Sequence, residues 1–241
     1  MNRDFQRVME AAFSAAKRVG EPQFFHERHQ ELRQAEEVFA RNELVQRVFA
    51  LLGKESLAVG HGIKHAQSVA LFAAAIVICD DGNADEVIMA LVAGLLHDIC
   101  RNQQDHALLG AQRARLLLAD FPLDVDFCER VANAIAVHEA FQEERWAAIG
   151  DKSLLANALY DADKFLWGPE NFTSTLWEML ALREISLKKL HENWERGMAG
   201  VRRVRGSFRS LTGKAYGPDF IDRGLLIGEA IGHFLGAQSG E

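Results

Sequence analysis

The residues best suited to chemistry are histidines and aspartates placed at the ends of apolar helical patterns. In LVAGLLHDICRN, residues 91–102, an apolar run ends in His97 and Asp98. From Val87 to Leu96 the residues are apolar or small at almost every helical position, which is typical of a helix buried on all sides. An ionised carboxylate beside such a helix costs several kcal/mol unless it is paired or binds a metal. We therefore expect a cation at Asp98.

Other histidines and aspartates continue the apolar faces of predicted helices. His65 is followed by apolar residues at the i+4, i+7, i+8 and i+11 positions, and His138 is preceded by apolar residues at matching positions. His106 begins HALLGAQRARLLL on its apolar face. In LLANALYDADKFLW, Asp161 and Asp163 both continue apolar positions, so periodicity does not choose between them. Five helices thus direct an imidazole or a carboxylate into one interior.

The ligand types in this group indicate a metal centre. A buried histidine taken alone is more often hydrogen-bonded to a carbonyl group than bound to a metal. Imidazole and carboxylate together are ligands for zinc, manganese or iron, and the lack of inward cysteine pairs argues against a structural zinc site. The cysteines are far apart in the sequence and are expected to be reduced and buried: Cys79, Cys100 and Cys128. The group therefore predicts a catalytic metal.

The elements that must position these residues are predicted to be helices, because strand-like alternation is scarce and only four prolines occur. Asn83 and Glu86 have the spacing of a capping box, and Asp105 is expected to cap the helix that follows it. The predicted helices span residues 2–19, 24–52, 65–79, 84–99, 106–119, 126–140, 151–167, 171–196 and 219–236. The basic, glycine-containing stretch 201–220 is predicted to be a long solvated loop.

The composition fits a globular protein with no membrane partner, and it favours a small-molecule partner over nucleic acid. Hydrophobic residues make up 49% and charged residues 25% of the 241 residues, and the net charge is −7. This charge gives no overall attraction to nucleic acid or anionic lipid. The first residues, MNRDFQRVMEAAFSAAKRVG, carry charges throughout and lack the apolar core of a signal peptide. We expect a cytoplasmic protein, with His26 and His29 on its surface.

The motifs in their order resemble the HD-domain superfamily of metal-dependent phosphohydrolases, an all-helical fold named for its His-Asp pair. The core pattern resembles His65 in GHGIKHAQSVA, then LLHDI, then Asp163 in DADKF. The phrase ADKF favours Asp163 over Asp161 as the last ligand. Members with two metals add histidines in phrases similar to HALLG and IAVH, which contain His106 and His138. No GYP-type motif follows His138, unlike the cyclic di-GMP phosphodiesterases of the family.

The resemblance implies an all-α, HD-domain-like helical bundle that forms a single domain over residues 1–241. Its five-helix metal-binding core would span about residues 61–167, with flanking helices in 1–52 and 171–241. It implies one or two divalent ions per chain, chosen from Mn, Fe, Zn, Co, Ni and Mg. The metal ligands would be His65, His97, Asp98, Asp163, His106 and His138, with Asp98 as the bridge.

The implied activity is hydrolysis of a small-molecule phosphate ester, a nucleotide among the candidates, by metal-activated water. Besides Asp98, the nearest cations in sequence are catalytic candidates: Lys64, Arg101 and Lys164. Arg101 stands where a lysine is common soon after the HD pair. His61 is a candidate for a substrate contact or a loop cap. A diiron oxygenase of the same fold and a non-catalytic ligand sensor are the alternatives. The sequence leaves the substrate, the metal and the oligomeric state open, a homodimer included.

Overall fold

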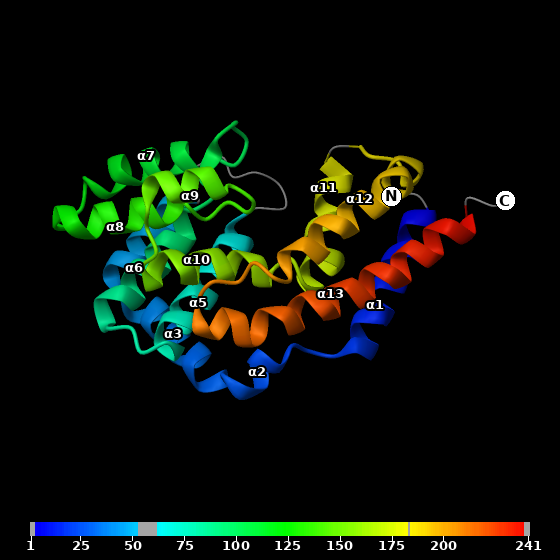
Figure 1. Ribbon diagram of the computed structural model, residues 1–241, viewed down its shortest axis with the longest axis horizontal. Helices are drawn as coiled ribbons and strands as arrows, with labels where there is room; N and C mark the ends of the chain where they lie inside the picture. Colours follow the sequence, from blue (N-terminus) through cyan, green and yellow to red (C-terminus); the bar gives the residue numbers. More distant parts are fainter. Residues whose placement is uncertain (1–2, 53–61, 183, 239–241) are drawn as a thin grey trace. The chain divides into compact units, whose positions relative to one another are not determined.

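The computed structural model describes residues 3–52, 62–182 and 184–238, and every regular element in these ranges is a helix (Figure 1). The predicted all-α fold is therefore confirmed. None of the described helices combines the length and the hydrophobicity that a membrane crossing requires. His61 lies outside the described residues.

The contacts divide the chain into two compact units, each assembled from separate stretches. Unit 1 comprises residues 1–23, 164–207 and 216–241, and unit 2 comprises residues 24–163 and 208–215. The reading of the whole chain as one domain stays a prediction. All six predicted metal ligands belong to unit 2.

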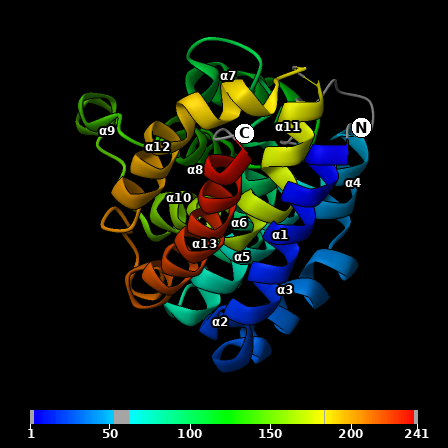
Figure 2. The same cartoon turned by 90° about the vertical axis from the view of Figure 1, so that its right-hand side faces the viewer.

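Unit 2 is built around a pair of neighbouring helices, α5 (Ile63–Cys79) and α6 (Ala84–Leu96), which lie side by side (Figure 1 and Figure 2). The other helices that lie wholly or mostly in unit 2 are α2 (Gln23–Glu27), α3 (His29–Arg41), α4 (Glu43–Leu52), α7 (His106–Leu118), α8 (Val125–Ala136), α9 (Glu143–Ile149) and α10 (Leu154–Phe165). The first residues of α13 (Leu211–Gln238) also belong to unit 2. Around α5 and α6, α3 packs on α5, α4 and α8 contact α6, and α7 contacts α8.

Helix α6 is the buried helix that its composition predicts. Every residue from Met89 to Ile99 is buried. The helix begins with the predicted capping box, because the Asn83 side chain accepts from the Glu86 backbone N–H and the Glu86 carboxylate accepts from the Asn83 N–H. The apolar run before the His-Asp pair therefore forms part of the core of unit 2.

Several predicted boundaries are wrong. The helix predicted over 24–52 is interrupted at Arg28 and Asn42. Asp105 precedes α7 in a left-handed conformation, φ +55°, and makes no capping bond, since its carboxylate binds Arg145 instead. Helix α9 has no counterpart in the prediction. The three cysteines are free, as expected, but each is only partly buried.

The prediction of a long loop over residues 201–220 is also wrong. Helix α12 (Leu187–Val204) and helix α13 (Leu211–Gln238) leave only residues 205–210 between them. The start of α13 is held by a carboxylate far away in the sequence: Asp80 accepts from the N–H groups of Leu211 and Thr212 at 3.0 and 3.1 Å. These bonds satisfy donors that a helix start otherwise leaves unpaired, and no local pattern reveals them.

Unit 1 contains α1 (Arg3–Val19), a short π-helix η1 (Asn171–Thr175) that contacts α1, then α11 (Leu176–Leu182), α12 and most of α13. The helix predicted over 171–196 is thus divided into separate elements. Within this unit the rings of Phe165 and Phe220 stack with centroids 4.3 Å apart. The Arg223 guanidinium donates to the carbonyl oxygen of Val19, which ties α13 to the end of α1.

Candidate metal centre

The centre starts at the end of α6, where the chain leaves the helix and His97 remains fully buried. His97 Nδ1 lies 2.7 Å from the Gly94 carbonyl oxygen. A carbonyl oxygen only accepts, so Nδ1 carries the proton and Nε2 keeps its lone pair. Burial lowers the pKa of His97 to about 3, which keeps the ring neutral at neutral pH. Among the described residues, Nε2 has no hydrogen-bond partner and lies 3.5 Å from Asp98 Oδ2.

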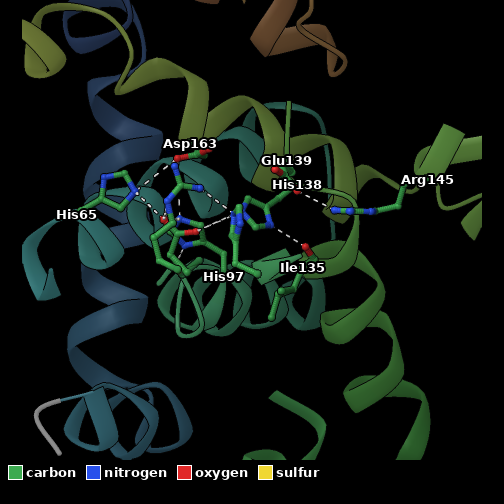
Figure 3. A network of polar contacts seen from close by, with 11 residues as sticks. His65, His97, Ile135, His138, Glu139, Arg145 and Asp163 are labelled. Atoms are coloured by element: carbon green, nitrogen blue, oxygen red, sulfur yellow. Dashed lines mark hydrogen bonds and ion pairs between the residues drawn. The ribbon is translucent and has the colours of Figure 1, made fainter. Parts of the chain in front are cut away.

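Two further side chains converge on this point from other helices. His65 comes from α5 and Asp163 from α10, and His65 Nε2 lies 3.4 Å from Asp163 Oδ1. The same histidine nitrogen lies 4.0 Å from Asp98 Oδ2, and His97 Nε2 lies 3.9 Å from Asp163 Oδ1. In Figure 3 the labelled His65, His97 and Asp163 point toward one another. These three side chains and Asp98 form what we call the first group.

The other oxygen of Asp98 faces a second pair of imidazoles. Asp98 Oδ1 lies 3.4 Å from His138 Nε2 and 3.6 Å from His106 Nε2. His138 follows the end of α8, and its Nδ1 lies 2.6 Å from the Ile135 carbonyl oxygen, which leaves Nε2 as the nitrogen with a lone pair. Asp98, His106 and His138 form the second group. Asp98 is therefore shared by both groups.

The geometry fits divalent metal ions. The ligand-type atoms of His65, His97 and Asp98 lie within 4.8 Å of one another, and those of Asp98, His106 and His138 do so too. Both carboxylates and all the imidazoles except His65 are buried, and a buried carboxylate is stable only with a positive partner. The cluster can hold a metal. The role of each residue as a ligand stays a prediction, which this arrangement supports.

The structure assigns different surroundings to Asp161 and Asp163, between which periodicity did not choose. Asp161 is fully buried and accepts from the Ser210 N–H at 2.7 Å, the Ser210 hydroxyl at 2.6 Å and the Arg209 N–H at 2.9 Å. Burial raises the pKa of Asp161 to about 6, and the bonds from Ser210 and Arg209 oppose that rise. Asp161 thus anchors the start of α13, whereas Asp163 faces His65 and His97.

The three cations proposed for catalysis lie in different surroundings. Arg101 contacts the second group directly, with Nη1 2.8 Å from His106 Nε2 and Nε 3.8 Å from Asp98 Oδ2. Lys64 is exposed on α5. Lys164 is buried, and its ammonium nitrogen lies 5.7 Å from the centre of the Trp167 ring. Of these three predictions, the contacts support Arg101 most directly.

Arg145 on α9 was not predicted from the sequence. Its side chain links Glu139 and Asp105, which are the sequence neighbours of two candidate ligands. Its Nη1 donates to Glu139, next to His138, and its Nη2 donates to Asp105, next to His106, both at 2.7 Å. Figure 3 shows Arg145 reaching Glu139 on the outer side of His138. Nothing in the spacing of EERW after His138 indicates this link, because Asp105 is distant in the sequence.

Arg209 was expected in a solvated basic loop, and that expectation is wrong. Its guanidinium lies between two rings, 3.8 Å from the Trp146 centroid and 3.5 Å from the Tyr160 centroid. Its Nη1 donates to the carbonyl oxygen of Val137 at 3.2 Å, one residue before His138. Arg209 therefore packs α9 and α10 together behind the second group. In contrast, Arg202, Arg203, Arg205 and Lys214 are exposed.

Comparison with known proteins agrees with this geometry. Residues 62–168 match the model of a protein family described as HD domain. The match begins just before His65 and extends past Asp163, so it includes both groups. No curated protein and no solved structure matches the chain.

Proposed function

We propose that this chain, which carries an HD domain of the HD-domain superfamily over residues 62–168, is a metal-dependent phosphohydrolase that acts on a small-molecule phosphate ester. The observation that carries the proposal is the sharing of Asp98, whose two carboxylate oxygens face separate groups of histidines. A nucleotide is among the substrates to be tested, and the cytoplasm is the proposed location.

The first group would hold one divalent ion through His65, His97, Asp98 and Asp163. The second group would hold another through His106 and His138, with Asp98 common to both. A divalent ion bound there would polarise a phosphoryl oxygen and supply hydroxide from water near neutral pH.

The chain's own contribution is to hold these ligands in a buried, preorganised site. His97 and His138 reach it with their Nε2 lone pairs fixed by Nδ1 bonds to backbone carbonyls. Arg101 supplies a permanent positive charge beside Asp98, suited to the charge that develops on phosphoryl oxygens. Lys64, being exposed, would contact substrate from the rim of the site.

The test begins with elemental analysis of freshly purified protein. Metal-stripped protein is then reloaded with Mn²⁺ or Co²⁺, and phosphate release is measured on a panel of phosphomonoesters and phosphodiesters that includes nucleotides. We expect hydrolysis that disappears in His97→Ala and Asp98→Ala. The matched control is His191→Ala, which removes an exposed histidine of unit 1 and should retain full activity.

Two outcomes would replace the proposal. Iron in the purified protein together with substrate-dependent oxygen consumption and no phosphate release would indicate the diiron oxygenase. Metal binding that His97→Ala abolishes, without turnover of any kind, would indicate the ligand sensor. Circular dichroism of each variant in metal-free buffer checks that a loss of activity does not come from unfolding.

A further inference from the structure

Arg101 lies against the second group, in contact with His106 and Asp98. Helix α6 ends at Leu96, and the chain then turns. Within this turn the Arg101 backbone N–H donates to the Asp98 carbonyl oxygen at 2.9 Å. This turn brings the Arg101 side chain back over the Asp98 carboxylate. Its Nη1 then reaches His106 Nε2 at 2.8 Å.

The hydrogen bond between Arg101 and His106 can have only one direction. A guanidinium has five N–H donors, no acceptor, and keeps its proton in proteins. At 2.8 Å it must therefore donate to the lone pair of His106 Nε2. An imidazole nitrogen has a single lone pair, so His106 Nε2 accepts from Arg101 or binds a metal, and not both.

We propose that Arg101 is a built-in competitor for the second metal position, so that the chain holds one ion firmly and admits another only when the guanidinium swings away. The inference rests on the metal centre of the proposed function and names its regulation. The Arg101 guanidinium also lies 3.8 Å from Asp98 Oδ2, the oxygen that faces the first group, so its charge opposes a cation at either position and only its hydrogen bond to His106 distinguishes the two. At the first position the lone pair of His97 Nε2 is not blocked in this way, because this nitrogen has no hydrogen-bond partner among the described residues.

Arg101 has room to move. Its side chain is 36% exposed, whereas the Asp98 and His106 side chains are 5% and 9% exposed. The guanidinium can leave for solvent or for an anionic ligand while the histidine and the carboxylate stay in place. An anionic ligand such as a phosphate ester would draw Arg101 away from His106 and so favour entry of a second ion.

The test is a calorimetric titration of metal-stripped protein with Mn²⁺, in which both the stoichiometry and the dissociation constant of each step are measured. The variant Arg101→Met keeps an aliphatic side chain and removes the charge and the donors. We expect the wild-type protein to bind one ion tightly and a second far more weakly. In Arg101→Met the second step should tighten about ten- to a hundredfold, the range for loss of one charge-assisted hydrogen bond. The first step should tighten less, because it gains only from the loss of the charge.

Two further variants test whether the tighter second step arises at the second group. The double variant Arg101→Met/His138→Ala should lose the gain in the second step, because His138 belongs to the second group. Arg115→Met is the matched control: Arg115 pairs with Glu129 through two 2.8 Å bonds between α7 and α8, so its loss removes a charge and an ion pair elsewhere in unit 2. This control should leave both steps as in the wild-type protein.

The outcomes separate this inference from the proposed function. If the first step is retained and the second step tightens no more than the first in Arg101→Met, or if Arg115→Met gives an equal gain, the inference alone is overturned. Two equally tight steps in the wild-type protein overturn it as well. Absence of Mn²⁺ binding in all these folded proteins overturns the metal centre itself and the inference with it.

Discussion

His97 and His138 are oriented by the same device. Each follows the last turn of a helix and donates its Nδ1–H to a carbonyl oxygen three residues earlier, Gly94 for His97 and Ile135 for His138. The bond fixes the orientation of each ring and leaves Nε2 directed away from the carbonyl oxygen that holds Nδ1. Two of the candidate ligands are thus aimed by their own helices before any partner contacts them.

At the same scale, the two aspartates of α10 give a matched pair of variants. Asp163→Asn should weaken metal binding by more than about 100-fold, since even changes behind a ligand cost up to that much. Asp161→Asn should leave metal affinity within about threefold but lower the free energy of unfolding by about 1–3 kcal/mol, because an amide N–H₂ then faces the donors of Ser210. Metal titration and urea denaturation measure both quantities for each variant. The reverse pattern would assign the ligand role to Asp161.

At the scale of elements, the separation of α5 and α6 is set by a glycine. A Cβ on Gly94 would lie 2.3 Å from the Ala70 Cα and 2.6 Å from its nitrogen, both rigid backbone atoms. Only glycine lets the two backbones come this close. Because His65 lies on α5 and His97 follows α6, this packing also sets the distance between two ligands of the first group.

Gly94→Ala should therefore damage both the fold and the site. We expect a loss of at least about 2 kcal/mol in the free energy of unfolding from overpacking, together with weaker metal binding. Gly197→Ala is the matched control, since Gly197 is an exposed position inside α12 with nothing within 4 Å of an added Cβ. It should stabilise by about 0.4–1 kcal/mol. Similar effects of the two substitutions on unfolding would show that the approach of α5 and α6 is not tight.

A second element, α9, supports the second group through Arg145. Arg145→Met removes the 2.7 Å bonds to Glu139 and Asp105 at once, and we expect the second metal step to weaken about tenfold while the first is unchanged. Arg115→Met again serves as the control. The measurement is the same Mn²⁺ titration, and equal weakening of both steps would point to a general loss of structure rather than positioning of the second group.

At the scale of the molecule, the candidate ligands come from α5, from the turn after α6, from α7, from the end of α8 and from α10, all within unit 2. These segments lie together only in the folded chain. Any metal that binds them therefore binds the native state and stabilises it by mass action.

Metal removal should accordingly lower the thermal stability of unit 2. At an ion concentration of 100 times the dissociation constant, the stabilisation is about 2.7 kcal/mol, which corresponds to a rise of roughly 5–10 °C in Tm for a chain of this size. Differential scanning calorimetry with Mn²⁺ and with a chelator measures the shift. It should vanish in His97→Ala and persist in His191→Ala. A shift that survives His97→Ala would place the stabilising ion elsewhere.

The helices and most of the candidate site follow from the sequence because both depend on local order. Burial of α6, the capping box at Asn83 and the inward face of His65 are consequences of which residues recur along a helix turn. The motifs around His97, Asp98, His106 and His138 are short, so their resemblance to the HD-domain superfamily could be recognised without knowledge of any distant contact.

The tertiary structure alone decided what depends on contacts between distant residues. The surroundings of Asp161 and Asp163 differ because Ser210 and Arg209 reach one and not the other. The chain is helical from Leu211, where a loop was expected, because Asp80 meets the start of α13. Arg145 also joins groups that are far apart along the chain. A helical pattern records which face of a segment is apolar, but only the packed chain determines which polar groups meet there.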